Sequence, residues 1–329
     1  MTKEALLNIE DLYVHFKVYG GFLQVLNGVN FRVFSGEKVG LVGETGCGKT
    51  TTMKTVMRIL PQPPGVIRGG RVFFRGQDVL KMREPEVEVL RRKHVSMIFQ
   101  DPTASLNPVF TVGEQMLEVV RFSRGTNLDD SSHREMAIRA LQEVALPDPE
   151  RILASYPLQL SGGMRQRVCI AMALVSHKEL LIADEPGTSL DVTIQDQILR
   201  LIHRLAEERN MAVILISHSL GVIREWTDRV YVMYAGCMIE EAGTRELFAE
   251  PLHPYTQALM KCVPKLTGTG VFEGIPGRIP DYFDPPSGCR FHPRCPQAFE
   301  RCLKEKPPFY EVKDGHRVAC FLFGGKSDA

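Results

Sequence analysis

Short apolar segments, bounded by glycine, proline and polar residues, divide the first hundred residues of the chain. Segments typical of strands lie at residues 6–16, 25–34, 38–43, 69–80 and 94–100. Residues 51–60 have the pattern of a helix, which the proline-rich stretch at 61–65 ends. Because the strand at 38–43 runs into a glycine-rich loop, we expect a mixed sheet arranged around that loop.

Helical patterns replace these strands after residue 100. Residues 113–122 and 133–146 have helical character and predict a helical subdomain inserted into the sheet. Beyond it the chain alternates helix and strand, as a doubly wound parallel sheet does, until a tail too irregular to be another sheet repeat. We expect parts at residues 1–100 (β subdomain and first part of the core), 101–160 (helical), 161–250 (rest of the core) and 251–329 (C-terminal extension).

Charge and cysteine usage narrow the possible classes of protein. Forty basic and 39 acidic residues give a net charge of +1, so no overall field attracts nucleic acid or anionic lipid. The N-terminus lacks the apolar core of a signal peptide, and no stretch approaches the ~20 apolar residues of a membrane span. We therefore expect a cytosolic chain, in which the clustering of four of the eight cysteines in residues 289–329 indicates a metal or a cluster.

The glycine-rich loop GETGCGKT, residues 43–50, lies between a predicted strand and a predicted helix, the context in which this pattern binds phosphate. Its glycines let backbone amides close on the phosphates of ATP, Lys49 adds a charge and the Thr50 hydroxyl a Mg²⁺ ligand. The side chain of Cys47 is expected to be incidental. The predicted phosphate-site residues are Gly43, Glu44, Thr45, Gly46, Cys47, Gly48, Lys49, Thr50 and Thr51.

Carboxylates follow the apolar strand LLIADE at its C-terminal edge. We expect Asp184 to hold Mg²⁺ and Glu185 to activate the attacking water, the alternative being that Glu185 is a solvated strand end. Gln100, at the end of another strand, can touch both Mg²⁺ and that water. His218 follows a third strand, and we expect it to bond the γ-phosphate.

A second candidate phosphate-binding element occurs at LSGGM, where a predicted helix begins at Ser161, Gly162 and Gly163. Exposed amides at a helix N-terminus attract phosphate. The loop at 43–50 already accounts for one nucleotide, so we interpret this element as serving the ATP of a partner.

Taken in order, GETGCGKT, Gln100, LSGGM, LLIADE, SLD (189–191) and His218 resemble the nucleotide-binding subunits of ATP-binding cassette (ABC) transporters, over about residues 5–245. The resemblance implies an α/β P-loop NTPase fold: a RecA-like core, an antiparallel β subdomain, an inserted α-helical subdomain and, here, an irregular cysteine-ligated extension. It also implies two subunits packed head to tail, with Ser161 and Gly163 on the partner's ATP, Asp191 at the nucleotide site and hydrolytic activity.

The resemblance further matches Phe16 to the aromatic residue that stacks on adenine. A core phenylalanine is the alternative, and Tyr13 or Tyr19 could take its place. Gly187, where the family usually has threonine, and Ser219, where it has aspartate, depart from the pattern; neither removes a catalytic group.

Residues 100–115, HPYTQAL and DPPSGCRFHPRC resemble the ATPase subunits of dipeptide and oligopeptide importers, whose relatives move nickel, glutathione or oligosaccharides. This resemblance implies a second ATPase subunit, more often a paralogue than an identical copy. It also implies two transmembrane permease subunits, an extracytoplasmic solute-binding protein and a place at the cytoplasmic face of the membrane.

Four cysteines of the tail, Cys289, Cys295, Cys302 and Cys320, form a candidate ligand set. Four thiolates can hold Zn²⁺ or an iron-sulfur cluster, and their wide spacing suits a cluster. The resemblance implies [4Fe-4S]; Zn²⁺ and unligated thiols are the alternatives, and His292 and His316 are not expected as ligands.

Two other classes of function remain. A soluble ABC ATPase acting on nucleic acid or ribosomes generally has two cassettes or a coiled-coil insertion, and this chain has neither. A redox or metal sensor that uses the cysteine tail is the third interpretation.

Overall fold

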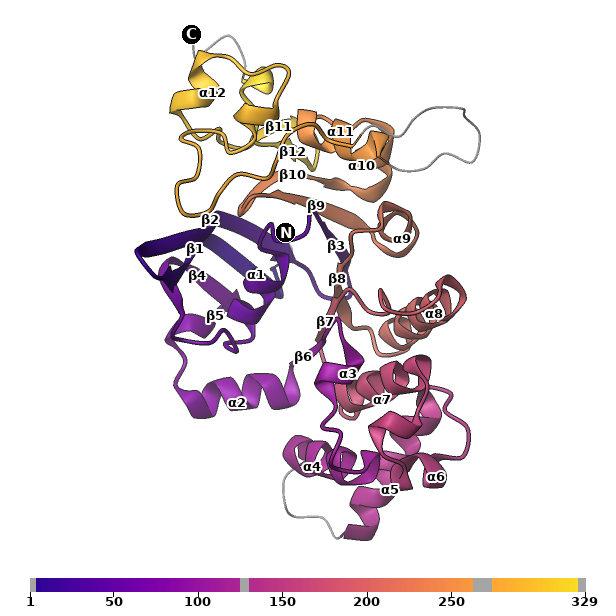
Figure 1. The fold of residues 1–329 in the computed structure, drawn as a ribbon. Coiled ribbons are helices and arrows are strands. Elements are labelled where there is room, and N and C mark those ends of the chain that lie inside the picture. Colours follow the sequence, from indigo (N-terminus) through magenta and orange to yellow (C-terminus); the bar gives the residue numbers. More distant parts are fainter. Residues whose placement is uncertain (1–3, 125–129, 263–273, 325–329) are drawn as a thin grey trace. The chain divides into compact units, whose positions relative to one another are not determined.

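The computed structural model describes residues 4–124, 130–262 and 274–324 of the chain. It divides into two compact units (Figure 1). Unit 1 combines the chain up to residue 34 with residues 38–81 and the chain from residue 216 onward. Unit 2 consists of residues 35–37 and 82–215. The chain therefore leaves unit 1 after the first helix and returns to it near residue 216.

An antiparallel sheet of unit 1 forms from the first predicted strands, in the order β2-β1-β4-β5. Its strands are β1 (Leu7–Val18), β2 (Gly21–Val33), β4 (Gly65–Phe74) and β5 (Gln77–Asp78). On β1, buried Leu7 and Ile9 alternate with polar residues, and the register shifts before buried Leu12. Asp11 takes a positive φ of 48° there, so a bulge keeps the apolar side chains on the buried face.

A second set of strands in unit 1 runs in the order β11-β12-β10-β9-β3. These are β3 (Lys38–Val42), β9 (Arg229–Tyr234), β10 (Cys237–Gly243), β11 (Tyr310–Lys313) and β12 (His316–Val318). β3 and β9 are parallel, whereas β10 and the two tail strands pair antiparallel. Two short strands of the otherwise irregular tail join this sheet, because β12 pairs with β10 and β11 pairs with β12.

Helix α1 (Lys49–Val56) of unit 1 follows the glycine loop, two residues earlier than the predicted start at 51. The other helices of this unit are α9 (Leu220–Trp226), α10 (Thr244–Ala249), α11 (Pro254–Lys261) and α12 (Glu300–Lys304), with short 3₁₀ turns η1 (Val79–Lys81), η3 (His292–Arg294) and η4 (Phe321–Phe323).

In unit 2, strands β6 (Val95–Ile98), β7 (Leu180–Asp184) and β8 (Ala212–Ile216) lie in the order β8-β7-β6. Every residue of these strands is buried, the pattern of a parallel sheet covered on both faces. β6 and β7 are parallel neighbours, so their C-terminal ends meet at one edge.

Helices of unit 2 include the predicted helical subdomain. They are α2 (Glu84–Lys93), α3 (Pro102–Ser105), α4 (Val112–Arg124), α5 (Asp130–Glu143), α6 (Pro149–Ala154), α7 (Gly162–Leu174) and α8 (Val192–Glu208), with the 3₁₀ turn η2 (Pro157–Gln159). No helix within the described residues is both long enough and apolar enough to span a membrane.

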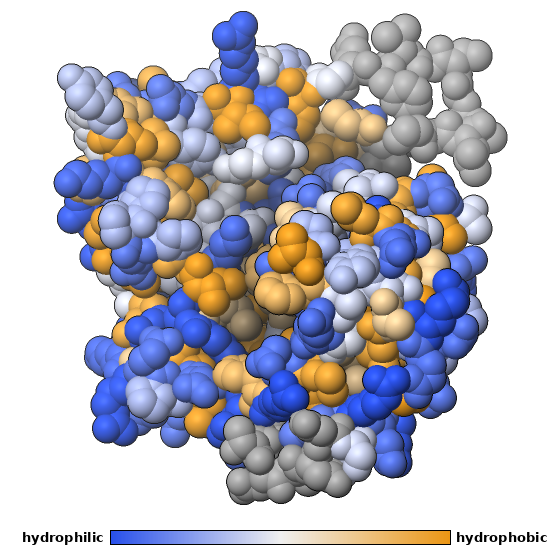
Figure 2. Space-filling model, turned by 60° about the horizontal axis from the view of Figure 1, so that its bottom comes forward, coloured by the Kyte–Doolittle hydropathy of each residue, from blue (hydrophilic) through white to orange (hydrophobic). Residues whose placement is uncertain are grey.

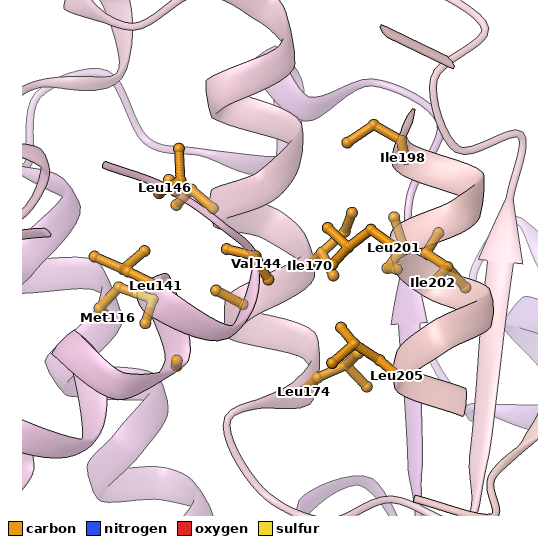
Figure 3. Close-up of a cluster of buried hydrophobic side chains, with 14 of the residues drawn as sticks. Met116, Leu141, Val144, Leu146, Ile170, Leu174, Ile198, Leu201, Ile202 and Leu205 are labelled. Atoms are coloured by element: carbon orange, nitrogen blue, oxygen red, sulfur yellow. The ribbon is translucent and has the colours of Figure 1, made fainter. Parts of the chain in front are cut away.

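The core of unit 2 gathers around α7 (Figure 3). Met116 and Leu141, from α4 and α5, lie on one side of α7, and Leu201 and Leu205 of α8 lie on the other. Ile170 of α7 is fully buried between them. α7 therefore packs against both the helical subdomain and α8. This packing orients the N-terminus of α7, which carries the LSGGM element.

Candidate nucleotide-binding and hydrolysis site

The glycine loop connects the end of β3 with the start of α1 in unit 1. Gly43 has φ 154°, and a Cβ there would lie 2.1 Å from the Met233 carbonyl oxygen. Gly48, with φ 109°, precedes the helix and provides no side-chain cap. The first turn of α1 thus has no side-chain cap at the position where a phosphate would bind.

Lys49 is buried and directed back along this loop. Its Nζ donates to the carbonyl oxygens of Gly43, at 2.7 Å, and Glu44, at 3.1 Å. Burial raises the pKa of the Cys47 thiol, so the thiol keeps its proton. Thr50 and Thr51 lie in the first turn of α1, each partly buried.

Unit 2 places two of the predicted catalytic residues in contact. Asp184, the last residue of β7, is buried, and Glu185 follows it at φ 49°, an uncommon backbone conformation for a glutamate. Gln100, just beyond β6, donates from Nε2 to Glu185 Oε2 at 3.1 Å. Strained backbone and a paired carboxylate at the end of parallel strands are features of functional sites.

Ser161 is the N-cap of α7, and its Oγ accepts a hydrogen bond from Met164 N at 3.3 Å. The first turn of α7 contains no acidic residue, so its amides present positive potential. A Cβ on Gly163 would lie 2.9 Å from Ile194 Cγ2, and one on Gly162 would lie 2.8 Å from Leu190 Cδ2. Glycine at both positions lets the start of α7 pack closely against the segment that leads into α8.

Asp191, predicted at the nucleotide site, has a local structural role as well. It is the N-cap of α8, and its Oδ1 accepts from Ile194 N at 3.0 Å. Gly187 nearby has φ 97°, a backbone conformation that favours glycine over the threonine of the family pattern. The departure at this position therefore has a conformational reason.

The remaining predicted residues of the site lie in unit 1. Phe16 is a partly exposed residue of β1, paired with Leu23 of β2 and Gly65 of β4. Tyr13 is engaged elsewhere, because the Lys306 ammonium lies 5.9 Å from its ring centroid. His218 is exposed in the segment after β8. Thr50 comes from unit 1, whereas Gln100 and Asp184 come from unit 2, so their grouping around one Mg²⁺ stays a prediction.

Three side chains that the sequence did not single out contact the glycine loop. Arg294 forms two hydrogen bonds with the Glu44 carboxylate, Tyr255 Oη accepts from Glu44 N at 3.0 Å, and Tyr282 Oη donates to the Gly46 carbonyl at 2.9 Å. All three belong to the C-terminal third of the chain. Arg294 and Tyr255 lie in the motifs FHPRC and HPYTQAL, the only signal that could have drawn attention to them.

Comparisons with known proteins agree with this geometry. The family described as "ABC transporter" matches residues 26–188, and the family "Oligopeptide/dipeptide transporter, C-terminal region" matches residues 239–302. The chain is 46% identical over 324 residues to the probable peptide ABC transporter ATP-binding protein y4tR of Sinorhizobium fredii, covering 97% of this chain and 95% of that protein.

Two further relatives are named as ATP-binding proteins of peptide transport. The oligopeptide transport ATP-binding protein OppD of Bacillus subtilis is 42% identical, with 96% of this chain and 88% of that protein covered. The dipeptide transport ATP-binding protein DppD of Escherichia coli is also 42% identical, with 96% of each covered. The chain belongs to the ATP-binding subunits of the oligopeptide and dipeptide ABC transporter family.

A solved structure supports the same assignment. The dimeric ATP-binding cassette MJ0796, in a post-hydrolysis state bound to ADP and Pi, has a TM-score of 0.65 and 25% identity, covering 73% of this chain and 99% of that chain. The cassette fold and the ATPase activity predicted from the sequence are thereby confirmed.

The four tail cysteines of this ABC subunit line one small cavity, together with His253, Phe291 and Phe321. Burial raises the thiol pKa of Cys289 to about 12 and of Cys320 to about 11, and the neighbouring thiols add to both shifts. His316 is engaged elsewhere, with Nε2 2.8 Å from Glu240 Oε1. Within residues 4–124, 130–262 and 274–324, no three His, Cys, Asp or Glu side chains have the geometry of a site for one metal ion.

Exposed apolar side chains of the helical subdomain are concentrated before α4 and after α6: Val109, Phe110, Tyr156 and Leu158. The hydrogen bond from Val112 N to the Ser155 carbonyl, 2.9 Å long, joins these two segments. A groove beside them is lined by Phe110, Glu114, Gln115, Leu117, Glu118 and Arg121. On the face in Figure 2, apolar side chains form small groups among hydrophilic ones. Such groups on a subunit that works in a complex are candidate docking points.

Proposed function

We propose that this subunit hydrolyses ATP to energise the import of dipeptides or oligopeptides by a binding-protein-dependent ABC transporter. The observation that carries the proposal is the presence, in one chain, of a glycine-rich phosphate loop before α1 and a separate capped helix start free of acidic residues. Two phosphate-seeking elements are complementary halves of two sites, which calls for a second cassette. The relatives named for peptide and dipeptide transport supply the cargo class.

The proposal assigns a role to each residue of the nucleotide site. Lys49 and the amides of residues 43–51 bind the phosphates, Phe16 stacks on the adenine, and His218 bonds the γ-phosphate. Glu185 accepts the proton of the attacking water, which Gln100 helps to orient. The signature residues Ser161 and Gly163 act on ATP held by the partner cassette.

The oxygen donors Thr50, Gln100 and Asp184 fit Mg²⁺, a hard cation that prefers carboxylate and hydroxyl oxygen. Mg²⁺ would neutralise charge on the phosphates. Asp184 is suited to the role because its carboxylate lies at the end of β7, the C-terminal edge at which such folds bind ligands.

The partners follow from the same assignment. The second ATPase subunit is a paralogue or an identical copy, and two transmembrane permeases connect the pair to an extracytoplasmic solute-binding protein. We propose that Phe110 and Leu158 of the 101–160 subdomain, both exposed, contact a cytoplasmic segment of a permease. In this proposal the subunit lies at the cytoplasmic face of the membrane. Residues 1–100 and 161–250 supply the nucleotide-binding core, and residues 251–329 form the extension.

We further propose that Cys289, Cys295, Cys302 and Cys320 ligate a [4Fe-4S] cluster. The support is that all four cysteines line one small cavity, as the ligands of one cluster must. The cluster would cross-link a loop-rich segment. Anaerobically purified protein should absorb in the visible range, and Cys302→Ser should abolish the absorption, whereas Cys262→Ser, outside the set, should not. A colourless parental protein containing zinc would contradict the cluster.

Reconstitution of the transporter tests the main proposal. Purified permeases with this subunit should show ATPase activity that a peptide-loaded binding protein stimulates. A panel of peptides, oligosaccharides, nickel and glutathione then distinguishes the peptide cargo from its alternatives. Phe110→Glu should reduce copurification with the permeases without weakening ATP binding, with Leu303→Glu in the tail as the matched control. Stimulation by nickel or oligosaccharide alone would overturn the peptide assignment.

A further inference from the structure

Glu44 is the only acidic residue of the phosphate loop, residues 43–50. An unpaired carboxylate here would add negative charge beside the amides and the lysine that bind the phosphates of ATP, and like charges repel. In unit 1 the charge is paired: Arg294 Nη1 lies 2.9 Å from one Glu44 carboxylate oxygen, and Nη2 lies 3.2 Å from the other. Two parallel bonds from one guanidinium make the strongest common type of ion pair.

Arg294 is held rigidly for this contact. Its side chain is only 4% exposed. Nε donates to the Pro276 carbonyl at 2.8 Å, and Nη2 also donates to the Ile275 carbonyl at 3.0 Å. A buried, fully bonded guanidinium is screened little by salt and loses little freedom on pairing, and lysine could not reproduce its geometry.

Glu44 connects Arg294 to Lys49. The side chain of Glu44 binds Arg294, its amide binds Tyr255 Oη, and its carbonyl accepts a 3.1 Å hydrogen bond from Lys49 Nζ. A displacement of Glu44 would therefore move an oxygen atom that orients the Lys49 ammonium. Arg294 acts on Lys49 through Glu44.

Tyr282 is a second contact from the C-terminal part to the same loop. Its hydroxyl donates to the Gly46 carbonyl at 2.9 Å, and its own carbonyl accepts from Gln24 N at 2.7 Å. Burial raises the pKa of Tyr282, so the hydroxyl keeps the proton that it donates. The loop is thus held at Glu44 and at Gly46.

Aromatic packing fixes the segment that carries Arg294. Phe291, three residues before it, packs on Tyr234 and Tyr255 with ring centroids 5.1 and 5.5 Å apart. Arg290 Nη1 donates to the carbonyl of Gln24 at 3.0 Å and to that of Ala235 at 2.6 Å. The loop between Cys289 and Cys295 is therefore part of the core of unit 1.

We propose that Arg294 is a positioning residue for ATP: it neutralises Glu44 and holds it so that the loop and Lys49 are preset for the phosphates. The inference rests on the ATPase function proposed above and gives the C-terminal extension a direct effect on nucleotide affinity. If Arg294 had only a structural role, it would anchor the C-terminal extension without any effect on ATP affinity.

The test compares Arg294→Ala, Arg294→Lys, Glu44→Gln and the double variant Arg294→Ala/Glu44→Gln in the assembled transporter. The matched control is Arg301→Ala, since Arg301 also lies in the tail and pairs with a glutamate, Glu305, at 2.9 Å. Affinity for a fluorescent ATP analogue, KM and kcat for ATP, and the thermal unfolding midpoint are measured for each.

Arg294→Ala should weaken ATP binding and raise KM roughly tenfold, the scale expected for loss of a charge-assisted contact, with kcat within about twofold of the parent. Arg294→Lys keeps the charge, so its ATP affinity should lie between that of the parent and that of Arg294→Ala. Arg294→Lys also serves as the test variant if Arg294→Ala does not fold. The double variant should regain most of the lost affinity, because the unpaired carboxylate is gone.

Parental ATP affinity in Arg294→Ala, an equal loss in Arg301→Ala, or no recovery in the double variant would each overturn the inference. Failure of the parental protein to bind ATP at all would instead count against the proposed function.

Discussion

Gln100 Nε2 donates a 3.1 Å hydrogen bond to the carboxylate of Glu185 in unit 2. The two residues are 85 positions apart in sequence, and they meet because β6 and β7 are parallel neighbours whose chains end at the same edge. Gln100 also lies directly before α3, where the helical subdomain begins. A movement of that subdomain would therefore reach Glu185, the proposed general base.

Removal of the Gln100 side-chain amide should uncouple Glu185 from the helical subdomain. Gln100→Ala is expected to lower kcat for ATP roughly tenfold, because it removes a contact that orients the water and one oxygen donor to Mg²⁺. ATP affinity should stay nearly unchanged, because Lys49 and the loop amides that bind the phosphates are untouched. Steady-state ATPase assays with and without loaded binding protein measure both effects. An unchanged kcat in both assays would show that the contact has no role in turnover.

Glu185→Gln should nearly abolish turnover, by at least about 100-fold, because an amide cannot accept the proton of the attacking water. The substitution keeps the size of the side chain, so ATP binding should persist. Equilibrium binding and phosphate release are measured on the same preparation. Hydrolysis at the parental rate would mean that Glu185 is a solvated strand end.

Complementation between two cassettes tests the role of Ser161. With Lys49→Ala in one subunit and Ser161→Arg in the other, both defects fall on one ATP site, so the second site stays intact and about half of the activity should remain. When one subunit carries both substitutions, each site has one defect and activity should be lost. Where the second ATPase is a paralogue, the matching positions are used. Equal activity of the two arrangements would refute shared sites.

Stability of unit 2 should depend on the cluster around α7. Leu141 is fully buried there, so Leu141→Ala should lower the free energy of unfolding by about 2–5 kcal/mol. Leu158→Ala is the matched control, because Leu158 is 70% exposed and should change stability by no more than about 0.5 kcal/mol. Denaturant unfolding of the purified subunit measures both, and equal losses would contradict the assigned core.

Local sequence patterns were sufficient for most elements of the fold. Residues 180–184 form a buried strand with Glu185 directly after it, and a helix follows at α8 as the predicted alternation requires, because apolar runs and helical periodicity reflect burial directly. The start of α1 was placed two residues late, since Lys49 and Thr50 were assigned to the glycine-rich loop that precedes the helix. The strands β11 and β12 were missed because three or four residues are too few to show alternation.

By itself the sequence determined the cassette family and the chemical parts: the phosphate loop, the LSGGM cap, the Asp184–Glu185 pair and four clustered cysteines. These signals are local, so the order of residues along the chain is enough to recognise them. Only the tertiary structure brought Gln100 to Glu185 and Arg294 to Glu44, contacts that span 85 and 250 positions. Such contacts depend on strand order and on the packing of distant segments, which leave no periodic trace in the sequence.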